Sequence, residues 1–334
     1  MSRRVTMASR PNGVPTEADF SVEDVEIPEP GPGEVLVRSL YVSVDPYQRG
    51  RMSDRRSYAR SLEIGDVITS QTVGEVVASQ DPRFAPGDIA VGQLGWQEHA
   101  VARAGVLRKV DPQLAPITTA LHVLGGTGMT AWFGLFDVGR PRAGDTVVVS
   151  AAAGAVGQIV GQLARIAGCR TVGIAGGREK CDDLRDLYGY DAAIDYKAED
   201  LRAALKGACP AGVDVYFDNV GGDVSAGVHA RLNVGARIAI CGQVSQYNEE
   251  RPAPTFHPGL LIVFRATMQG FLVSDYVARF PEAYPRLARW VADGTLRYRE
   301  HVTEGLENAP RAFIGMLNGE NRGKALVKVA DGST

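Results

Sequence analysis

The feature that most constrains the fold of this chain is a strand–loop–helix pattern, TVVVSAAAGAVGQIVGQLARIAG, at residues 146–168. Its apolar start, 146–150, predicts a buried strand. The part that follows repeats apolar residues at the spacing of one helix face, at Val156, Ile159, Val160 and Leu163. Because the first turn of a helix offers unpaired N–H groups and a partial positive charge, this order predicts a loop that holds the pyrophosphate of a dinucleotide.

The loop itself departs from the usual glycine fingerprint. Gly154 and Gly157 stand where the phosphate and the helix need glycine, but Ala151 holds the first position of the pattern. We expect alanine to cost little there if the turn forms without a positive φ. On the motif alone, a tight turn that binds nothing remains an alternative, and the strand–helix units that follow favour the nucleotide site.

Strands and helices alternate from about residue 144 onward, which predicts a parallel sheet covered on both faces. The first ~120 residues instead contain short strands separated by proline and glycine, as in a partly open β-barrel. The end of the chain, 312–329, predicts a helix, a turn and a strand that rejoins the N-terminal sheet. The further elements that we expect are strands at 34–44, 72–79, 87–92, 96–102, 170–175, 191–195, 213–222 and 235–242 and a helix at 178–189.

Composition excludes several classes of protein. A net charge of −3 gives no basic surface for nucleic acid or an anionic membrane, and no apolar run approaches the ~20 residues of a membrane helix. The first residues, MSRRVTMASRPNG, lack the apolar region of a secretory signal. The four cysteines are widely spaced without a C-x-x-C pair, which is typical of reduced thiols in a cytoplasmic protein.

The end of the second predicted strand indicates which cofactor binds. An acidic residue there would hydrogen-bond the ribose 2′-hydroxyl of NAD, but this chain has GIAGGREK at 173–180. Gly176 and Gly177 leave room for a bulky group, and Arg178 and Lys180 can pair with a 2′-phosphate. We therefore expect NADP(H), with Glu179 as the one carboxylate in the stretch.

Several segments together resemble one family, the zinc-independent medium-chain dehydrogenase/reductases of the prostaglandin reductase, leukotriene B4 12-hydroxydehydrogenase and curcumin reductase group. The resemblance runs through nearly the whole chain. It implies an α/β protein with a discontinuous GroES-like barrel domain, 1–124 and 305–334, and a Rossmann domain with a doubly wound parallel sheet, 125–304. It also implies a homodimer. The matching segments are RPNGVP (10–15), VSVDPYQRGRM (42–52), GTGMTAWFGL (126–135), VVVSAAAGAVGQIVGQLA (147–164), YFDNVGG (216–222), CGQVSQYN (241–248) and EGLENAPRAFIGMLNGENRGKALVKV (304–329).

The resemblance also implies which residues bind the cofactor and the substrate. Tyr47 is expected to line the substrate pocket, and Tyr247 to act beside the nicotinamide. The residues expected at NADP(H) are Ala152, Ala153, Gly154, Ala155, Val156 and Gly157 at the pyrophosphate; Gly176, Arg178, Lys180 and Tyr196 at the 2′-phosphate end; and Asn219, Cys241, Gly242, Ser245, Tyr247, Phe271, Leu272, Val273 and Asn321 toward the nicotinamide.

The activity that this family implies is NADPH-dependent reduction of the C=C bond of α,β-unsaturated ketones and aldehydes. Hydride reaches the β-carbon, and charge builds on the carbonyl oxygen, so the protein must supply hydrogen-bond donors there. Tyr247 and the nicotinamide ribose hydroxyl are the expected donors. We expect no zinc site, because no cysteine precedes Cys169 and the five histidines (His99, His122, His229, His257 and His301) are not at ligand spacing from a cysteine.

Two alternatives remain open on the sequence. A zinc-free NADPH:quinone oxidoreductase would share the fold and the cofactor, and a catalytically silent NADPH-binding protein would share the loops. The tyrosines of VDPY and SQYN favour an enone reductase. We expect the segment 53–66 to decide the size of the substrate pocket.

Overall fold

A computed structural model describes residues 1–55, 57–249 and 258–332, so Arg56 of the segment 53–66 and His257 lie outside it. The chain divides into two compact units, Met1–His122 with Glu300–Thr334 and Val123–Arg299. None of the helices in the described ranges is long and apolar enough to cross a membrane.

The first unit is built on a seven-stranded sheet in the order β14-β15-β3-β4-β5-β7, with β6 also paired to β3. The predicted strands in its N-terminal part are confirmed. Their bounds are β3 Glu34–Ser43, β4 Gln71–Ser79, β5 Ile89–Gln93 and β6 His99–Arg103. The structure adds elements that were not predicted: the short strand β7 (Arg108–Lys109), the helix α1 (Tyr47–Arg51), and β1 (Ser2–Met7) with β2 (Phe20–Val25), which form a separate hairpin.

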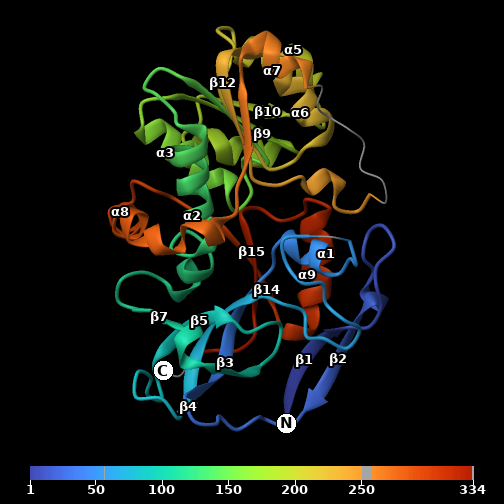
Figure 1. The fold of residues 1–334 in the computed structure, drawn as a ribbon, viewed down its shortest axis with the longest axis vertical. Coiled ribbons are helices and arrows are strands. Elements are labelled where there is room, and N and C mark those ends of the chain that lie inside the picture. Colours follow the sequence, from blue (N-terminus) through green and yellow to red (C-terminus); the bar gives the residue numbers. More distant parts are fainter. Residues whose placement is uncertain (56, 250–257, 333–334) are drawn as a thin grey trace. The chain divides into compact units, whose positions relative to one another are not determined.

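The C-terminal segment completes this sheet. After α9 (Ala309–Leu317), β15 (Lys324–Lys328) pairs antiparallel with β3, with Val327 opposite Val42, so the predicted return of the chain is confirmed (Figure 1, red beside blue). Residues 300–304, which we expected in the nucleotide-binding domain, form β14 (Glu300–Glu304). They belong to the first unit because β14 pairs along its whole length with β15.

A ring cluster fills the core of the first unit beneath this sheet. Trp96, Phe20 and Phe313 come from three distant segments, and their ring centroids lie 5.9–6.2 Å apart. Such tilted and edge-to-face pairs add to the burial of apolar area. The indole of Trp96 also donates to the carbonyl of Ser43 at 3.1 Å, so this core is directly attached to the end of β3.

The second unit is a six-stranded parallel sheet in the order β10-β9-β8-β11-β12-β13. Counted along the chain this is 3-2-1-4-5-6, the order of doubly wound dinucleotide-binding sheets. The Rossmann prediction is therefore confirmed. Its strands are β8 Thr146–Ser150, β9 Arg170–Ala175, β10 Ala192–Asp195, β11 Val213–Asp218, β12 Leu232–Ile240 and β13 Thr267–Gly270.

The helices of this unit connect the strands, and one differs from its prediction. The helix expected at 178–189 is regular only over α4, Arg178–Asp182, and continues as a π-helical turn over Asp183–Leu187. The others are α2 Gly126–Phe133, α3 Gly157–Ile166, α5 Leu201–Ala208, α6 Gly222–His229, α7 Gly259–Phe264 and α8 Phe280–Ala292.

Candidate functional site

The loop between β8 and α3 is shaped by close contact of backbone with backbone. A Cβ on Gly157 would lie 2.5 Å from the carbonyl oxygen of Ala151 and 2.6 Å from the Cα of Ala152, so only glycine fits where the helix begins. Ala151 has φ +46°, so the condition under which we expected alanine to cost little, a turn without a positive φ, is not met. The turn must reverse tightly because the next residue, Ala152, donates its N–H back to Ile174 of β9 at 3.0 Å.

This geometry fits a pyrophosphate. Gly154 is also tight, since its Cβ would lie 3.0 Å from the carbonyl of Ala151. The ten residues of α3 begin directly after this turn. A glycine turn that leads straight from a strand into the start of a helix is the arrangement that binds phosphate in dinucleotide folds.

At the carboxyl end of β9, a second glycine turn packs against the end of β10. A Cβ on Gly176 would meet the ring of Tyr196 and the side chain of Lys197, each at 2.9 Å. Gly177 has φ +101°, and its N–H donates to the carboxylate of Asp195 at 2.8 Å. The structure therefore brings Gly176 and Tyr196 together, although they lie twenty positions apart in the chain.

Three cations come from the segments that surround this turn. Arg178 is 93% exposed and 3.8 Å from Asp182, Lys180 is partly buried, and Lys197 is exposed beside Gly176. Sequence reasoning missed Lys197; the signal was its place directly after Tyr196, at the carboxyl end of a strand next to β9. Lysine and arginine side chains at this edge fit the 2′-phosphate of NADP(H).

The loop after β11 is attached to the end of β8. Asn219 donates its backbone N–H to Ser150 Oγ at 2.9 Å and its side-chain amide to the Ser150 carbonyl at 2.8 Å. β8 and β11 are neighbours at the point where the strand order of the sheet reverses, which is where ligands bind in open α/β sheets. Asn219 thus lies where the strand order reverses, and its contact with the cofactor stays a prediction.

The segment after β12 gathers over the same loop. Ser245 Oγ donates to the carbonyl of Val220 at 2.7 Å. The Tyr247 hydroxyl accepts the backbone N–H of Gln243 at 3.4 Å, and a Cβ on Gly242 would lie 3.1 Å from that hydroxyl. The Tyr247 ring is therefore folded back across its own turn. Cys241, at the start of this segment, has its thiol pKa raised to about 12 by burial, so the thiol is neutral at pH 7.

The segment after β13 is held in place by its aromatic side chain, Phe271. The ring of Phe271 packs edge-on against Phe217 at 6.2 Å, and a Cβ on Gly134 would collide with it at 2.3 Å. Leu272 and Val273 follow and begin a 3₁₀ turn. All three residues are half-buried, and their contact with the nicotinamide end stays a prediction.

Tyr47 and Asn321 belong to the first unit. Tyr47 is the first residue of α1; its hydroxyl is buried without a well-formed hydrogen bond to a described residue, and burial together with the Asp45 charge raises its pKa. Asn321 lies in the turn between α9 and β15, where its amide donates to the Gly323 carbonyl at 2.6 Å. It also lines a hollow of about 360 Å³, together with Arg311 and Met316.

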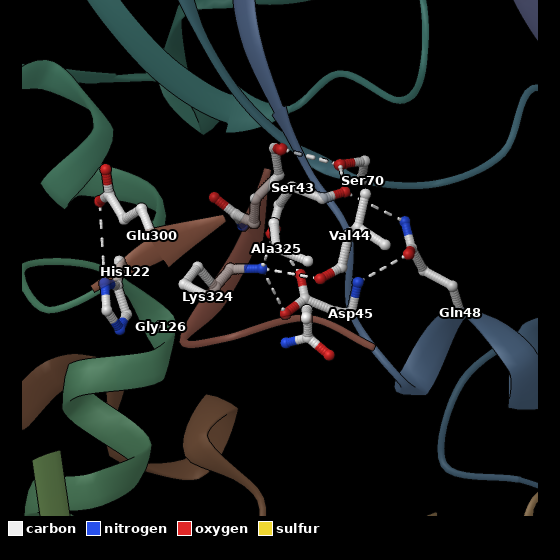
Figure 2. Close-up of polar contacts among 12 residues, drawn as sticks. Ser43, Val44, Asp45, Gln48, Ser70, His122, Gly126, Glu300, Lys324 and Ala325 are labelled. Carbon is white, nitrogen blue, oxygen red and sulfur yellow. Dashed lines mark hydrogen bonds and ion pairs between the residues drawn. The ribbon is translucent and has the colours of Figure 1, made fainter. Parts of the chain in front are cut away.

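A buried lysine holds the loop that leads to Tyr47. Lys324 Nζ donates to the Val44 carbonyl at 2.8 Å and to the Asp45 carboxylate at 2.9 Å (Figure 2). Asp45 in turn donates its N–H to Gln48 Oε1 at 2.8 Å, and the amide of Gln48 donates to the Thr69 carbonyl at 2.7 Å. Sequence reasoning missed Lys324, because nothing in KALVKV marks one lysine as buried.

Within the part of the chain that the structure describes, no three His, Cys, Asp or Glu side chains are grouped so that they could hold a metal ion. All four cysteines, Cys169, Cys181, Cys209 and Cys241, are free thiols.

Comparison with known proteins agrees with this architecture. Residues 3–110 match the family model described as the N-terminal domain of oxidoreductase, and residues 155–293 match the model described as zinc-binding dehydrogenase. An NADPH-dependent curcumin reductase of Escherichia coli is 43% identical, covering 98% of this chain and 97% of that protein. An NADP(+)-dependent 2-alkenal reductase of Nicotiana tabacum is 40% identical, covering 98% of each. The solved structure of CurA from Vibrio vulnificus in complex with NADPH has a TM-score of 0.95 at 44% identity, covering 98% of this chain and 99% of that one.

Proposed function

We propose that this chain reduces the C=C bond of α,β-unsaturated ketones and aldehydes with NADPH. It belongs to the family of NADP-dependent prostaglandin, curcumin and 2-alkenal reductases. The observation that carries the cofactor assignment is the second glycine turn. Gly176 is packed against Tyr196 and Lys197 where an NAD-selecting carboxylate would stand.

NADPH, when bound, supplies the hydride that adds to the β-carbon of the substrate. The side chain that we propose for the chemistry is Tyr247, as donor to the carbonyl oxygen on which negative charge builds. Its oxygen already accepts the Gln243 N–H, and hydrogen bonds in a chain strengthen one another, so this contact supports its role as a donor. Tyr47 is proposed to line the substrate pocket, supported by its buried hydroxyl.

The cofactor contacts belong to the same proposal. The pyrophosphate lies against the loop 152–157, and the 2′-phosphate against Arg178, Lys180, Tyr196 and the added Lys197. The nicotinamide end lies against Asn219 and the segment 241–247, with the backbone of 271–273 and Asn321. The tight glycines of the first loop and the hydrogen bonds that hold Asn219 to Ser150 support this assignment.

We also propose a metal-free cytoplasmic homodimer. The absence of cysteine from the first 168 residues supports a reaction without zinc, since zinc-dependent alcohol dehydrogenases hold their catalytic zinc with cysteine and histidine, and the four free thiols support a reducing compartment. The dimer is supported by β13, which is an edge strand of the six-stranded sheet. On the same unit, α7, which contacts β12, presents Ile262 and Val263, which are 80% and 61% exposed. A sheet edge and exposed apolar side chains on one unit favour pairing with a second copy.

The test is a panel of enones and alkenals of graded length, assayed with NADPH and with NADH, beside a 1,4-quinone. We expect turnover of the enones with NADPH, and kcat/KM lower with NADH by about tenfold or more, the effect of losing charged contacts to one phosphate. Turnover of the quinone alone would favour the quinone reductase instead. NADPH binding without any turnover would favour a silent binding protein, and an NADH preference would overturn the cofactor assignment.

A further inference from the structure

A buried carboxylate, that of Asp218, lies where the predicted cofactor loops meet. Asp218 is the last residue of β11 and is 1% exposed. A buried charge is costly unless hydrogen bonds satisfy it, and this one is surrounded by donors. Oδ1 accepts from Ser150 Oγ (3.1 Å), the Tyr216 hydroxyl (2.9 Å), Val220 N (2.9 Å) and Gly221 N (3.0 Å), and Oδ2 accepts from Ser225 Oγ (2.5 Å).

The backbone of the same residue holds a further loop. The Asp218 carbonyl accepts the N–H of Cys241 at 2.8 Å and that of Gly242 at 3.1 Å. Asp218 is therefore bonded to the end of β8, to its own loop 219–221, to α6 and to the segment after β12. Asn219, the residue next along the chain, is bonded to Ser150 as well. Two loops that approach the nicotinamide end in the proposed function, 219–221 and 241–242, are thus held through one residue.

The carboxylate also distinguishes the two helices that start at this edge of the sheet. The N–H groups of Val220 and Gly221, just before α6, point at Asp218 Oδ1. The protein's own anion thus occupies the start of α6, as the helix dipole favours. At the start of α3, Val156 and Gly157 have no anionic side chain, and Gln158 is bonded to the backbone of Arg299. A pyrophosphate is therefore directed to α3 and away from α6.

We propose that Asp218 is the positioning residue of the nicotinamide half of the cofactor site. Its carboxylate holds the loops 219–221 and 241–242 in place and closes the start of α6 to phosphate. The inference rests on the proposed use of NADPH, but it does not depend on which substrate is reduced. Asp218 itself touches neither cofactor nor substrate; it acts through Asn219 and through the segment that carries Tyr247.

The test compares Asp218→Asn with Asp214→Asn, a control on the same strand. Asp214 is also a bonded carboxylate, accepting from Thr146 N at 2.8 Å and from the Asn233 amide at 2.9 Å, but it lies at the amino end of β11. Two ligands are titrated by fluorescence or calorimetry: NADPH, and 2′,5′-ADP, which carries the adenosine end without the nicotinamide. Thermal unfolding of each variant is measured in parallel.

We expect Asp218→Asn to raise the Kd for NADPH about tenfold or more, as for loss of one to two buried charged hydrogen bonds, with 2′,5′-ADP binding changed less than about twofold. Asp214→Asn is expected to lower the Tm but to leave both Kd values within about twofold. The proposal is overturned if Asp218→Asn leaves the Kd for NADPH unchanged. It is also overturned if this variant loses affinity for NADPH and 2′,5′-ADP equally while its Tm falls.

A milder variant keeps the test decisive if Asp218→Asn does not fold. Ser225→Ala removes the donor to Oδ2 and keeps the charge, so we expect a Kd for NADPH that is raised about two- to fivefold at nearly native Tm. If Ser225→Ala leaves the Kd for NADPH unchanged, the proposal is overturned. Because the readout is binding, a protein that shows this pattern but reduces no enone would overturn the proposed reaction alone. A wild-type chain that fails to bind NADPH would overturn both.

Discussion

Lys324 Nζ lies 2.9 Å from Asp45 Oδ1, so that two residues 279 positions apart join the last strand of the chain to the loop before α1. The ammonium group also donates to the carbonyls of Val44 and Ala325, at 2.8 and 2.9 Å, and its side chain is 1% exposed. All three ammonium protons are used, which explains how a lysine charge is accommodated in the interior of the first unit.

Lys324→Met is expected to destabilise the protein strongly, because it leaves the Asp45 carboxylate partly buried without its cation. Removal of one partner from a buried pair costs about 3–5 kcal/mol of unfolding free energy. The measurement is urea unfolding followed by fluorescence. Lys328→Met, on the same strand, is the control: Lys328 pairs at the surface with Asp331 and Glu304, and its loss should change the unfolding midpoint little. Equal effects of the two substitutions would contradict a special role for Lys324.

Ala151→Gly is expected to stabilise the protein, because Ala151 is held at φ +46°, where glycine fits without strain. The gain should be about 0.5–1 kcal/mol, after the extra freedom of glycine in the unfolded chain is subtracted. Ala152→Gly is the matched control. Ala152 is buried and does not have a positive φ, so its replacement should destabilise instead. Unfolding curves that show the same sign for both would rule out strain at Ala151.

Lys197→Ala is expected to raise the KM for NADPH about three- to tenfold and to leave the KM for NADH unchanged, since only NADPH carries the 2′-phosphate. Steady-state kinetics with each cofactor measure the two values. Lys206→Ala removes an exposed lysine from α5 and should alter neither. If Lys197→Ala affected both cofactors alike, Lys197 would act on the fold of the turn and not on the phosphate.

Tyr247→Phe is expected to lower kcat on an enone about tenfold to a hundredfold, in the lower range for loss of one donor to a developing oxyanion. The Kd for NADPH should change much less, because the ring that packs over Gly242 is kept. Tyr284→Phe, on α8 of the same unit, controls for loss of a tyrosine hydroxyl elsewhere. An unchanged kcat would remove Tyr247 from the chemistry.

Stability is expected to fall as the pH rises from about 9 toward 11. Burial raises the pKa of the Cys169, Cys181 and Cys209 thiols to about 11. In the unfolded chain these thiols ionise near pH 8.5, so between about pH 8.5 and 11 the native state binds more protons than the unfolded chain. The stability that the protonated thiols contribute is fully present below about pH 8.5 and is lost as the pH passes through the folded pKa. Urea midpoints at about pH 8 and 10 measure the loss. Cys209→Val should show a smaller fall than wild type, and identical falls would contradict this origin.

Much of this architecture could be predicted because it depends on local patterns. The alternation of strands and helices predicted the parallel sheet covered on both faces, and the glycines at 176 and 177 indicated the cofactor. The features that could not be predicted depend on contacts between distant segments. The positive φ of Ala151 follows from the bond of Ala152 to β9, and the place of Lys197 follows from the register of β10 against β9.

The buried charges were missed for a related reason. Asp218 and Lys324 each stand at one end of a short apolar run, where a charged residue ordinarily marks the point at which a strand leaves the core. Only the assembled sheets show that donors or acceptors from several other segments converge on these two side chains. No pattern within one segment of the sequence contains that information.

The position of β15 between β14 and β3 has a consequence for synthesis on the ribosome. The second unit is one continuous stretch, Val123–Arg299, and all its strands have been made before the first unit can close. The N-terminal strands must wait, with Tyr41, Val42 and Ser43 of β3 lacking their ladder partners, until residues 324–328 have been made. The nucleotide-binding unit is thus an insert that can fold early, and the sheet that contains Lys324 is completed only after that insert has been made.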